Sequence, residues 1–278
     1  MRPLFLVVLI LLASGCATSL SGFQPAHVAP KGHVAAEFGW DVSAPVGTIV
    51  RSIDAAKTLA RAANNRSLTD AERRQLIAAG ADVAIDPPAL VTHAGLTYAP
   101  FTAWELGLRW SPGSWRGAVR HQFLDQAAHG VDLSAGVGLA RFTYEFPIND
   151  IIGDVLHLDD FTRWNLDIPL VVGKHSDWYR LWGGPRIMFS RFDSALTLHL
   201  PATGATPAEV VAASVEGNAT FLGGQGGFAL GYRYLFVGVE LTIVQLISSA
   251  HLELAGQRQD VELGGLVIYP GIALMGEF

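Results

Sequence analysis

The chain has little cysteine and little charge. Cys16 is the only cysteine among 278 residues, so the chain cannot form an internal disulfide, and a chain this long can bury enough surface to fold without one. Only 16% of the residues are charged, whereas 50% are apolar and the mean hydropathy is +0.31. That composition is too apolar for an ordinary soluble surface. The net charge of −6 also offers no basic surface for nucleic acid.

Long hydrophobic runs are missing as well. The two most apolar stretches beyond the N-terminus, 235–247 and 263–275, are shorter than the roughly 20 residues that a membrane-spanning helix needs. Glu240 interrupts the first stretch, and glycines together with Pro270 interrupt the second. Since lipid satisfies no backbone hydrogen bonds, the other structure that can cross it is a closed β-barrel. We therefore expect an all-β, antiparallel transmembrane β-barrel.

The N-terminus carries a targeting signal. Arg2 precedes an unbroken apolar stretch, 4–12, which is followed by small residues and then by Cys16. The sequence LASGC, at 12–16, resembles the bacterial lipobox, although alanine stands where leucine is commoner. The resemblance implies that residues 1–15 are removed and that Cys16 becomes an N-terminus acylated with fatty acids such as palmitate. The alternative is a plain secreted protein with a free thiol.

Behind the signal, the chain divides into a link, a barrel and one insertion. Residues 16–31 mix Ser, Pro and Gly without periodicity and predict a lipidated tether, which leaves 32–278 as the barrel domain. Within that domain, 48–82 breaks the β pattern, because apolar residues recur at helical spacing in its first half. Thr69 and Glu72 fit a capping box at the start of a second helix. We expect this helical insertion in the first long loop.

Alternation of apolar and polar residues predicts the strands. From Val34 to Val42, apolar side chains alternate with polar or small ones, which is typical of a barrel strand. The pattern recurs and predicts about ten strands, or eight if 91–98 and one neighbour do not span. A soluble β-sandwich would alternate in the same way and is the alternative. The other candidate segments are 91–98, 103–110, 115–123, 132–139, 164–173, 179–190, 225–233, 237–243 and 265–278.

The lengths of the connections orient the barrel. Transmembrane barrels have short periplasmic turns and longer outer loops. Here every second connection is short and most of the others are long, so both termini of the barrel are expected at the periplasmic side. The long outer loops are predicted at 44–90, 147–162, 193–217 and 247–261, with a tight exception at 111–114.

The C-terminus is consistent with the same class. The chain ends at Phe278, with Leu274, Ile272 and Pro270 at alternate positions before it. This end resembles the assembly signal of outer-membrane barrels, from which Gly276 departs. Together with the lipobox, it makes the chain similar to bacterial outer-membrane β-barrel lipoproteins of uncharacterised type. The resemblance implies a protein of the cell outer membrane, lipid-anchored at the periplasmic face. Its implied partners are membrane lipids and the barrel-assembly and lipoprotein-sorting machinery.

Charged side chains fall on the strand face that would line the lumen. A barrel this small is filled by its own side chains, and an unpaired charge inside it is costly. We therefore expect a network of arginines and carboxylates that plugs the barrel, and a gated pathway for small solutes is the alternative. The predicted lumen residues are Glu37, Asp41, Glu105, Arg109, Arg116, Arg120, Asp167, Arg180, Arg186, Arg233 and Glu240.

No motif assigns a reaction. The G-x-S-x-G sequence and zinc-ligand spacings are absent, so we expect no catalytic residues, no cofactor and no metal ion. Some outer-membrane barrels cleave or transfer lipid acyl chains with serine and histidine near the outer rim, a region that would suit Ser249 and His251. His157 and Asp159 favour a solvated acidic loop over a calcium site. A structural or surface-interaction role is preferred, with a narrow transport channel and a lipid-modifying enzyme as alternatives.

Overall fold

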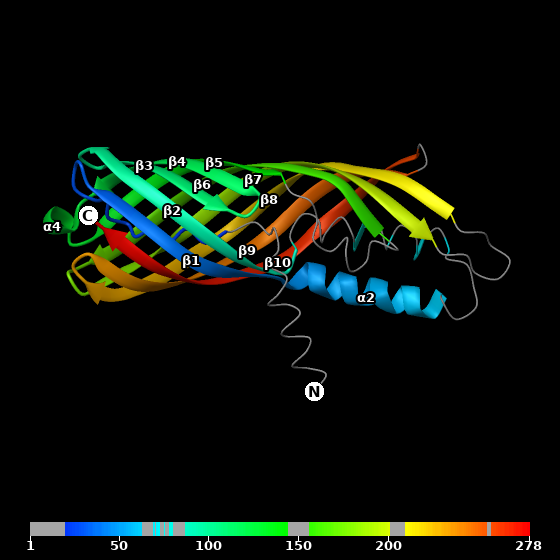
Figure 1. Ribbon diagram of the computed structural model, residues 1–278, viewed down its shortest axis with the longest axis horizontal. Coiled ribbons are helices and arrows are strands. Elements are labelled where there is room, and N and C mark those ends of the chain that lie inside the picture. Colours follow the sequence, from blue (N-terminus) through cyan, green and yellow to red (C-terminus); the bar gives the residue numbers. More distant parts are fainter. Residues whose placement is uncertain are drawn as a thin grey trace, which may run out of the picture.

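The strands form one closed ring. The computed structural model describes residues 20–62, 87–143, 156–200, 209–254 and 257–278, together with single positions between 69 and 79. Within these residues, ten antiparallel strands follow one another around a barrel, and β1 pairs with both β2 and β10 to close it (Figure 1). The predicted ten-stranded antiparallel barrel is confirmed. The strands are β1 (Val34–Pro45), β2 (Ala89–Phe101), β3 (Trp104–Ser111), β4 (Ser114–Leu124), β5 (Asp132–Thr143), β6 (Leu156–His175), β7 (Tyr179–Leu200), β8 (Glu209–Tyr232), β9 (Leu235–Leu254) and β10 (Gln257–Glu277).

The outside of the barrel is apolar over a broad band. Leu166 on β6 and Leu241 on β9 point outward and are 39% and 43% exposed, whereas their chain neighbours Asp167 and Thr242 are buried inside. Large apolar side chains that cover a closed surface in this way suit contact with hydrocarbon rather than with water. In the β-sandwich alternative, the same side chains would be packed between two sheets, so the closed ring excludes that fold.

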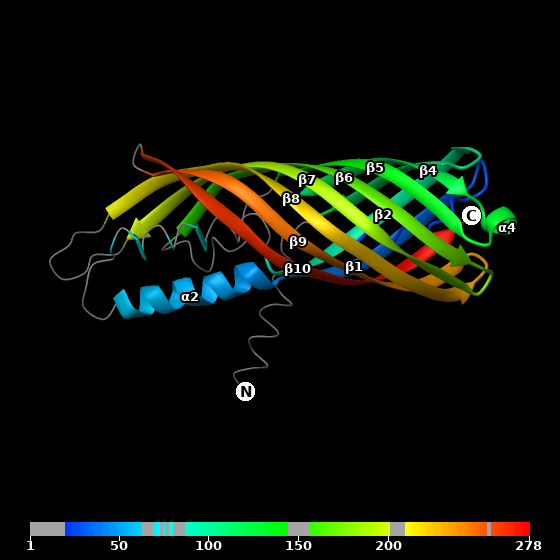
Figure 2. The same cartoon turned by 180° about the vertical axis from the view of Figure 1, so that it is seen from behind.

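The two ends of the barrel differ in their connections. We call the end at which β1 begins and β10 ends the terminal end, and we call the opposite one the far end (Figure 1). The turns 102–103, 176–178 and 233–234 join strands at the terminal end. The short helix α4 (Gln126–His129) completes the connections there, and both views show it beside the C-terminus (Figure 2). The expected short connections at this end are therefore present.

Several strands continue past the apolar band at the far end (Figure 2). On β9, the outward side chains from Leu235 to Ile247 are apolar except for Gln245, and they are followed by the exposed polar residues Ser249 and His251. The apolar stretch is slightly longer than the roughly 9–11 residues with which a tilted strand crosses a bilayer. The remainder of β9 therefore extends beyond the band.

The predicted outer loops 193–217 and 247–261 were wrong over most of their length. β7 continues to Leu200, β8 begins at Glu209, and β9 and β10 are separated only by 255–256. The error has a physical cause. Beyond the apolar band most outward side chains on β7, β8 and β9 are polar or small, so the period-two hydrophobic signal disappears although the backbone ladder continues.

Helix α2 (Val46–Ala62) begins beside β10. Pairing between β1 and β10 stops at Pro45 and Val267, and the first turns of α2 contact β10 next to that point, beyond which the helix and the strand diverge (Figures 1 and 2). The approach is close, since a Cβ atom added at Gly47 would lie 2.7 Å from the carbonyl oxygen of Gly264. Arg51 donates a hydrogen bond to that same carbonyl. The contact covers a short part of the β10 edge that β1 leaves unpaired.

The helical insertion predicted at 48–82 is partly described. Its first helix is present as α2. The capping box also forms, because the Thr69 hydroxyl and amide both donate to Glu72, 2.8 Å and 2.9 Å from its Oε2 atom. Most of 63–86 lies outside the described residues.

The segment before β1 lies inside the barrel. Leu20, Phe23 and Ala26 are each 2% exposed. The chain then leaves the lumen at the terminal end, where the Gly32 amide donates to the Ala99 carbonyl. This placement differs from the external tether expected over 16–31. The segment has no Asp, Glu, Lys or Arg before Lys31, so its burial leaves no charged side chain of its own without water or a partner. We call residues 20–28 the luminal segment.

Candidate functional site

The structure places ten of the eleven predicted lumen charges inside the barrel. Their side chains are at most 13% exposed. Arg233 is the exception, since it lies exposed in the turn between β8 and β9, with its guanidinium 5.0 Å from the centre of the Tyr232 ring. Its inward placement was wrong because the turn ends the alternation, and the residue adopts a φ of 56° there.

The inward charges pair with charges on other strands of the barrel. Arg120 on β4 binds both oxygens of Glu105 on β3 at 2.9 Å. Asp167 on β6 receives two bonds from Arg186, at 2.7 Å and 2.8 Å, and one from Arg116 at 2.7 Å. Such bidentate pairs fix the geometry of both partners and offset the cost of removing them from water.

Arginines also hold the luminal segment by its carbonyl groups. The contacts come from β3, β4 and β7, so three strands converge on one length of extended chain. Charge-assisted bonds of this kind are about twice as strong as bonds between neutral groups. The bonds are Arg186 to the Leu20 oxygen, Arg109 to the Ser21 oxygen, and Arg120 to the Pro25 and His27 oxygens.

Glu240 holds the same segment by its amide groups. Its two carboxylate oxygens accept from the amides of Gly22, at 2.5 Å, and Phe23, at 2.8 Å. The Trp182 indole N–H donates to the same carboxylate at 2.8 Å, which fixes its orientation. Lumen side chains therefore bind both acceptors and donors of the segment's backbone, as burial of a main chain requires.

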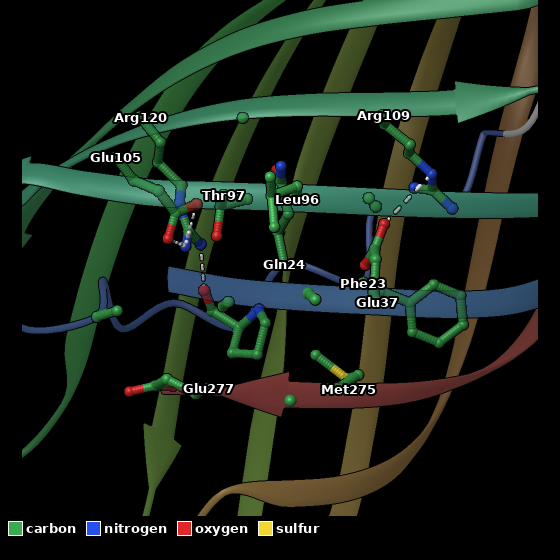
Figure 3. Close-up of a pocket in the computed structure, with 18 of the residues that line it drawn as sticks. Phe23, Gln24, Glu37, Leu96, Thr97, Glu105, Arg109, Arg120, Met275 and Glu277 are labelled. Carbon is green, nitrogen blue, oxygen red and sulfur yellow. Dashed lines mark hydrogen bonds and ion pairs between the residues drawn. The ribbon is translucent and has the colours of Figure 1, made fainter. Parts of the chain in front are cut away.

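Apolar contacts complete the binding site of the luminal segment. The Phe23 ring stacks on His93 with 5.3 Å between ring centres and shares a buried cluster with Trp182 and Met275. Figure 3 shows Phe23 beside the ion pair of Arg109 and Glu37, whose Nε and Oε1 atoms are 3.3 Å apart. A cavity beside the segment, lined by β1, β2, β3 and β10 among other strands, has a volume of about 50 Å³. That space holds only a few water molecules.

A layer of ionisable side chains surrounds the terminal-end exit of the segment. His27 lies 3.1 Å from Glu277, which Arg180 also binds at 2.7 Å. The His27 ring stacks on His175 with 4.4 Å between centres, and His175 lies 2.6 Å from Asp132. Burial, with a smaller contribution from Arg180, lowers the pKa of His27, which precedes β1, below its usual range.

The lumen is also filled on the far side of the segment. Arg163 is 1% exposed and donates from Nε to Asn165 at 2.8 Å and to Ser190 at 2.7 Å. Its guanidinium lies 5.6 Å from the centre of the Phe142 ring and 5.1 Å from that of Phe221. This layer fills part of the lumen beyond the luminal segment.

The luminal segment is the part of the site that the sequence analysis missed. Ser, Pro and Gly suggested an exposed link, but Leu20, Phe23 and Val28 are apolar and the stretch lacks charge. A solvated tether is normally more polar, and this was the available signal. The burial of His93 in the lumen was also not predicted, because a single histidine in a strand gives no sequence pattern.

The serine and histidine candidates lie elsewhere. His251 lies outside the barrel with its Nδ1 atom 2.5 Å from Asp260, and Ser249 shares that outward face two residues earlier on β9. Phe278 is 65% exposed and exchanges two backbone bonds with Val34, which ties the C-terminus to β1. Among the described residues, His, Cys, Asp and Glu nowhere gather in a group of three suited to a metal ion. None of the helices described is long and apolar enough to cross a membrane.

Comparisons with known proteins give no family. No family model matches the chain, and no curated protein is similar to it. Among solved structures, the chain is similar to the attachment invasion locus protein Ail of Yersinia pestis, with 9% identity, a TM-score of 0.29 and coverage of 89% of this chain and 99% of that one. A major outer membrane protein of Thermus thermophilus is 12% identical, with a TM-score of 0.34 and coverage of 68% of this chain and 98% of that one. The translocator domain of the autotransporter NalP from Neisseria meningitidis is 14% identical, with a TM-score of 0.35 and coverage of 87% of this chain and 61% of that one.

Proposed function

We propose that the chain is an integral outer-membrane β-barrel with a closed lumen and a structural or surface-interaction role. The observation that carries this proposal is the occupied lumen, in which the luminal segment and the paired charges leave a cavity of about 50 Å³. A channel for solutes needs a continuous hydrated path, which this packing does not offer. The apolar exterior supports the membrane location.

The closed lumen is tested by electrical recording of the intact protein in planar lipid bilayers. We expect insertion, shown by heat-modifiable migration of the reconstituted protein on gels, without conductance steps. Stable conductance steps from the intact chain would contradict the proposal and favour the narrow channel. A chain that stays in the soluble fraction would contradict the membrane location itself.

The polar far-end extension supports an interaction role. Arg191 and Asp193 on β7 and Glu216 on β8 face outward beyond the apolar band and are exposed. They lie on paired strands that continue beyond the apolar band, where many barrels display loops. Replacing all three residues with serine is expected to abolish binding to any surface partner without changing barrel migration on gels. Unchanged binding by that variant would argue against this surface.

The lipid-modifying alternative is weaker. The pair of His251 and Asp260 is solvated, with side chains 46% and 86% exposed, and lies beyond the apolar band rather than within lipid. A general base acts by contact with its nucleophile, and the contacts described for His251 include Asp260 but not Ser249. Membrane lipids from cells that express Ser249→Ala are expected to match those of the wild type. A change in acyl composition would support the enzyme instead.

Acylation at Cys16 is part of the proposal, although this residue lies outside the described chain. Four residues reach at most about 14 Å, so an acylated Cys16 stays within that distance of Leu20. Leu20 is buried in the lumen. Anchoring at the periplasmic face therefore requires the luminal segment to withdraw. Labelling cells with a palmitate analogue tests the modification, and we expect the label to be lost in Cys16→Ser. Equal labelling of that variant would refute acylation there.

A further inference from the structure

We propose that the lumen is a binding channel for an extended polypeptide strand, and that residues 20–28 occupy it as an exchangeable ligand. The inference deepens the proposed closed barrel, on which it rests, by assigning a ligand class to the lumen. The ligand is recognised mainly through its main chain.

The contacts themselves indicate main-chain recognition. Lumen arginines bind four carbonyl groups of the segment, those of Leu20, Ser21, Pro25 and His27. Lumen acceptors bind three amides, because Glu240 takes those of Gly22 and Phe23, and Gln122 takes that of Val28 at 2.7 Å. Every peptide offers these groups, whatever its side chains. Recognition of this kind resembles the addition of a strand to a sheet, except that side chains supply the partners.

The lumen arginines do not depend on the segment for their charge balance. Arg120 keeps Glu105, Arg186 keeps Asp167, and Arg109 keeps Glu37 when the segment is disregarded. Removal of a permanent core strand would leave buried charges without partners. Here the ion pairs belong to the barrel wall and remain when the occupant leaves, and Glu240 keeps the bond from the Trp182 indole N–H.

The luminal segment can also separate from the barrel wall without breaking the ring of strands. The first strand begins at Val34, so the segment contributes no strand to the ring. It is joined to β1 through the exposed residues Lys31, Gly32 and His33, and Gly32 adopts a φ of 88°, which suits glycine. An open cavity of about 660 Å³ at the terminal end is lined by the exit of the segment, including His27 and Lys31. A peptide can therefore enter or leave by this mouth.

Two positions set the side-chain preference. The Phe23 ring fills the buried cluster with Trp182 and Met275, so we expect an aromatic or large apolar residue there. At Gly22, an added Cβ would lie 3.5 Å from the nearest atom, which is ordinary contact, so alanine is tolerated. The ligand class is therefore an uncharged extended peptide with one bulky apolar residue.

The test uses the full chain with a protease recognition sequence inserted between Lys31 and Gly32. The protein is folded, reconstituted in planar bilayers and then cleaved. We expect no conductance before cleavage and conductance steps once the fragment has been washed out. A synthetic peptide of residues 20–31, added at the terminal-end side, is expected to close the barrel again. A peptide carrying Gly22→Ala should close it at a similar concentration, within about threefold.

Backbone methylation separates main-chain from side-chain recognition. N-methylation at Gly22 and Phe23 removes both donors to Glu240 and keeps every side chain, so closure is expected to need at least about tenfold more peptide. N-methylation at Gln24 is the matched control, because its amide makes no such bond to the described lumen residues, and it is expected to close the barrel like the parent peptide.

Three results would overturn the inference. In the first, the cleaved fragment stays bound through every wash that leaves the barrel folded. In the second, the opened barrel fails to close with the parent peptide. In the third, the doubly methylated peptide closes it as well as the parent does. Conductance before cleavage is a different result, which refutes the closed barrel of the proposed function.

Discussion

Replacing Glu240 with glutamine is expected to loosen the luminal segment while the barrel stays intact. The carboxylate accepts from the amides of Gly22 and Phe23, and glutamine has one acceptor oxygen for these two donors. A bond to a charged acceptor contributes about 1.5–3 kcal/mol, and losing one such bond corresponds to roughly 10- to 100-fold faster opening of the segment.

Hydrogen–deuterium exchange of the amides in residues 20–31, followed by mass spectrometry in detergent micelles, measures this opening. In Glu240→Gln, we expect the two amides to exchange faster by that factor, while strand amides keep their protection. Glu253→Gln is the matched control, since Glu253 is on the same strand but exposed outside the barrel, and it should match the wild type. Equal exchange in Glu240→Gln and the wild type would refute the role assigned to this carboxylate.

The remaining predictions concern the exterior and the terminal end. Leu241→Lys places a charge in the apolar band, at a cost of about 2–4 kcal/mol near the bilayer midplane, and should reduce insertion measured by heat-modifiable migration. His251→Lys, beyond the band on the same face, should insert normally. Equal insertion of both variants would argue against the assigned band. Because burial lowers the pKa of His27 below 6.5, the seated segment favours the neutral ring, so acidification through that value should favour release. Amide protection of residues 20–31, corrected for intrinsic exchange rates, should therefore fall between about pH 7.5 and about pH 5.5. His27→Gln should remove this dependence, and a wild-type segment equally protected at both values would contradict it.

Much of the barrel could be predicted from the sequence because lipid and lumen impose opposite demands on alternate residues. Trp164, Leu166 and Ile168 must face hydrocarbon, while Asp167 between them must not, and this contrast is visible in a single sequence. The inward charges follow from the same alternation. Their partners do not, because pairing of Arg116 with Asp167 depends on the tilt and stagger of the closed ring.

Two features could not be predicted in this way, for different reasons. β8 and β9 continue through Glu216 and His251, but the sequence there shows no hydrophobic period, because both side chains face outward beyond the apolar band. The luminal segment has no strand pattern at all, because it bonds through its backbone to side chains of several strands instead of to one neighbouring ladder. Arg233 was predicted to face the lumen because the alternation of β8 continues to it in the sequence, but the residue lies in a turn.

The seam between β1 and β10 has a consequence for the order of assembly. The luminal segment precedes β1, yet Glu240 and Glu277, which bind it, belong to the last two strands of the chain. The first described residues to be synthesised thus acquire these two partners only when the final strands arrive, after the arginines of β3, β4 and β7. Ring closure and completion of the contacts to the segment therefore depend on the same last strands, and a chain truncated before β9 would lack both.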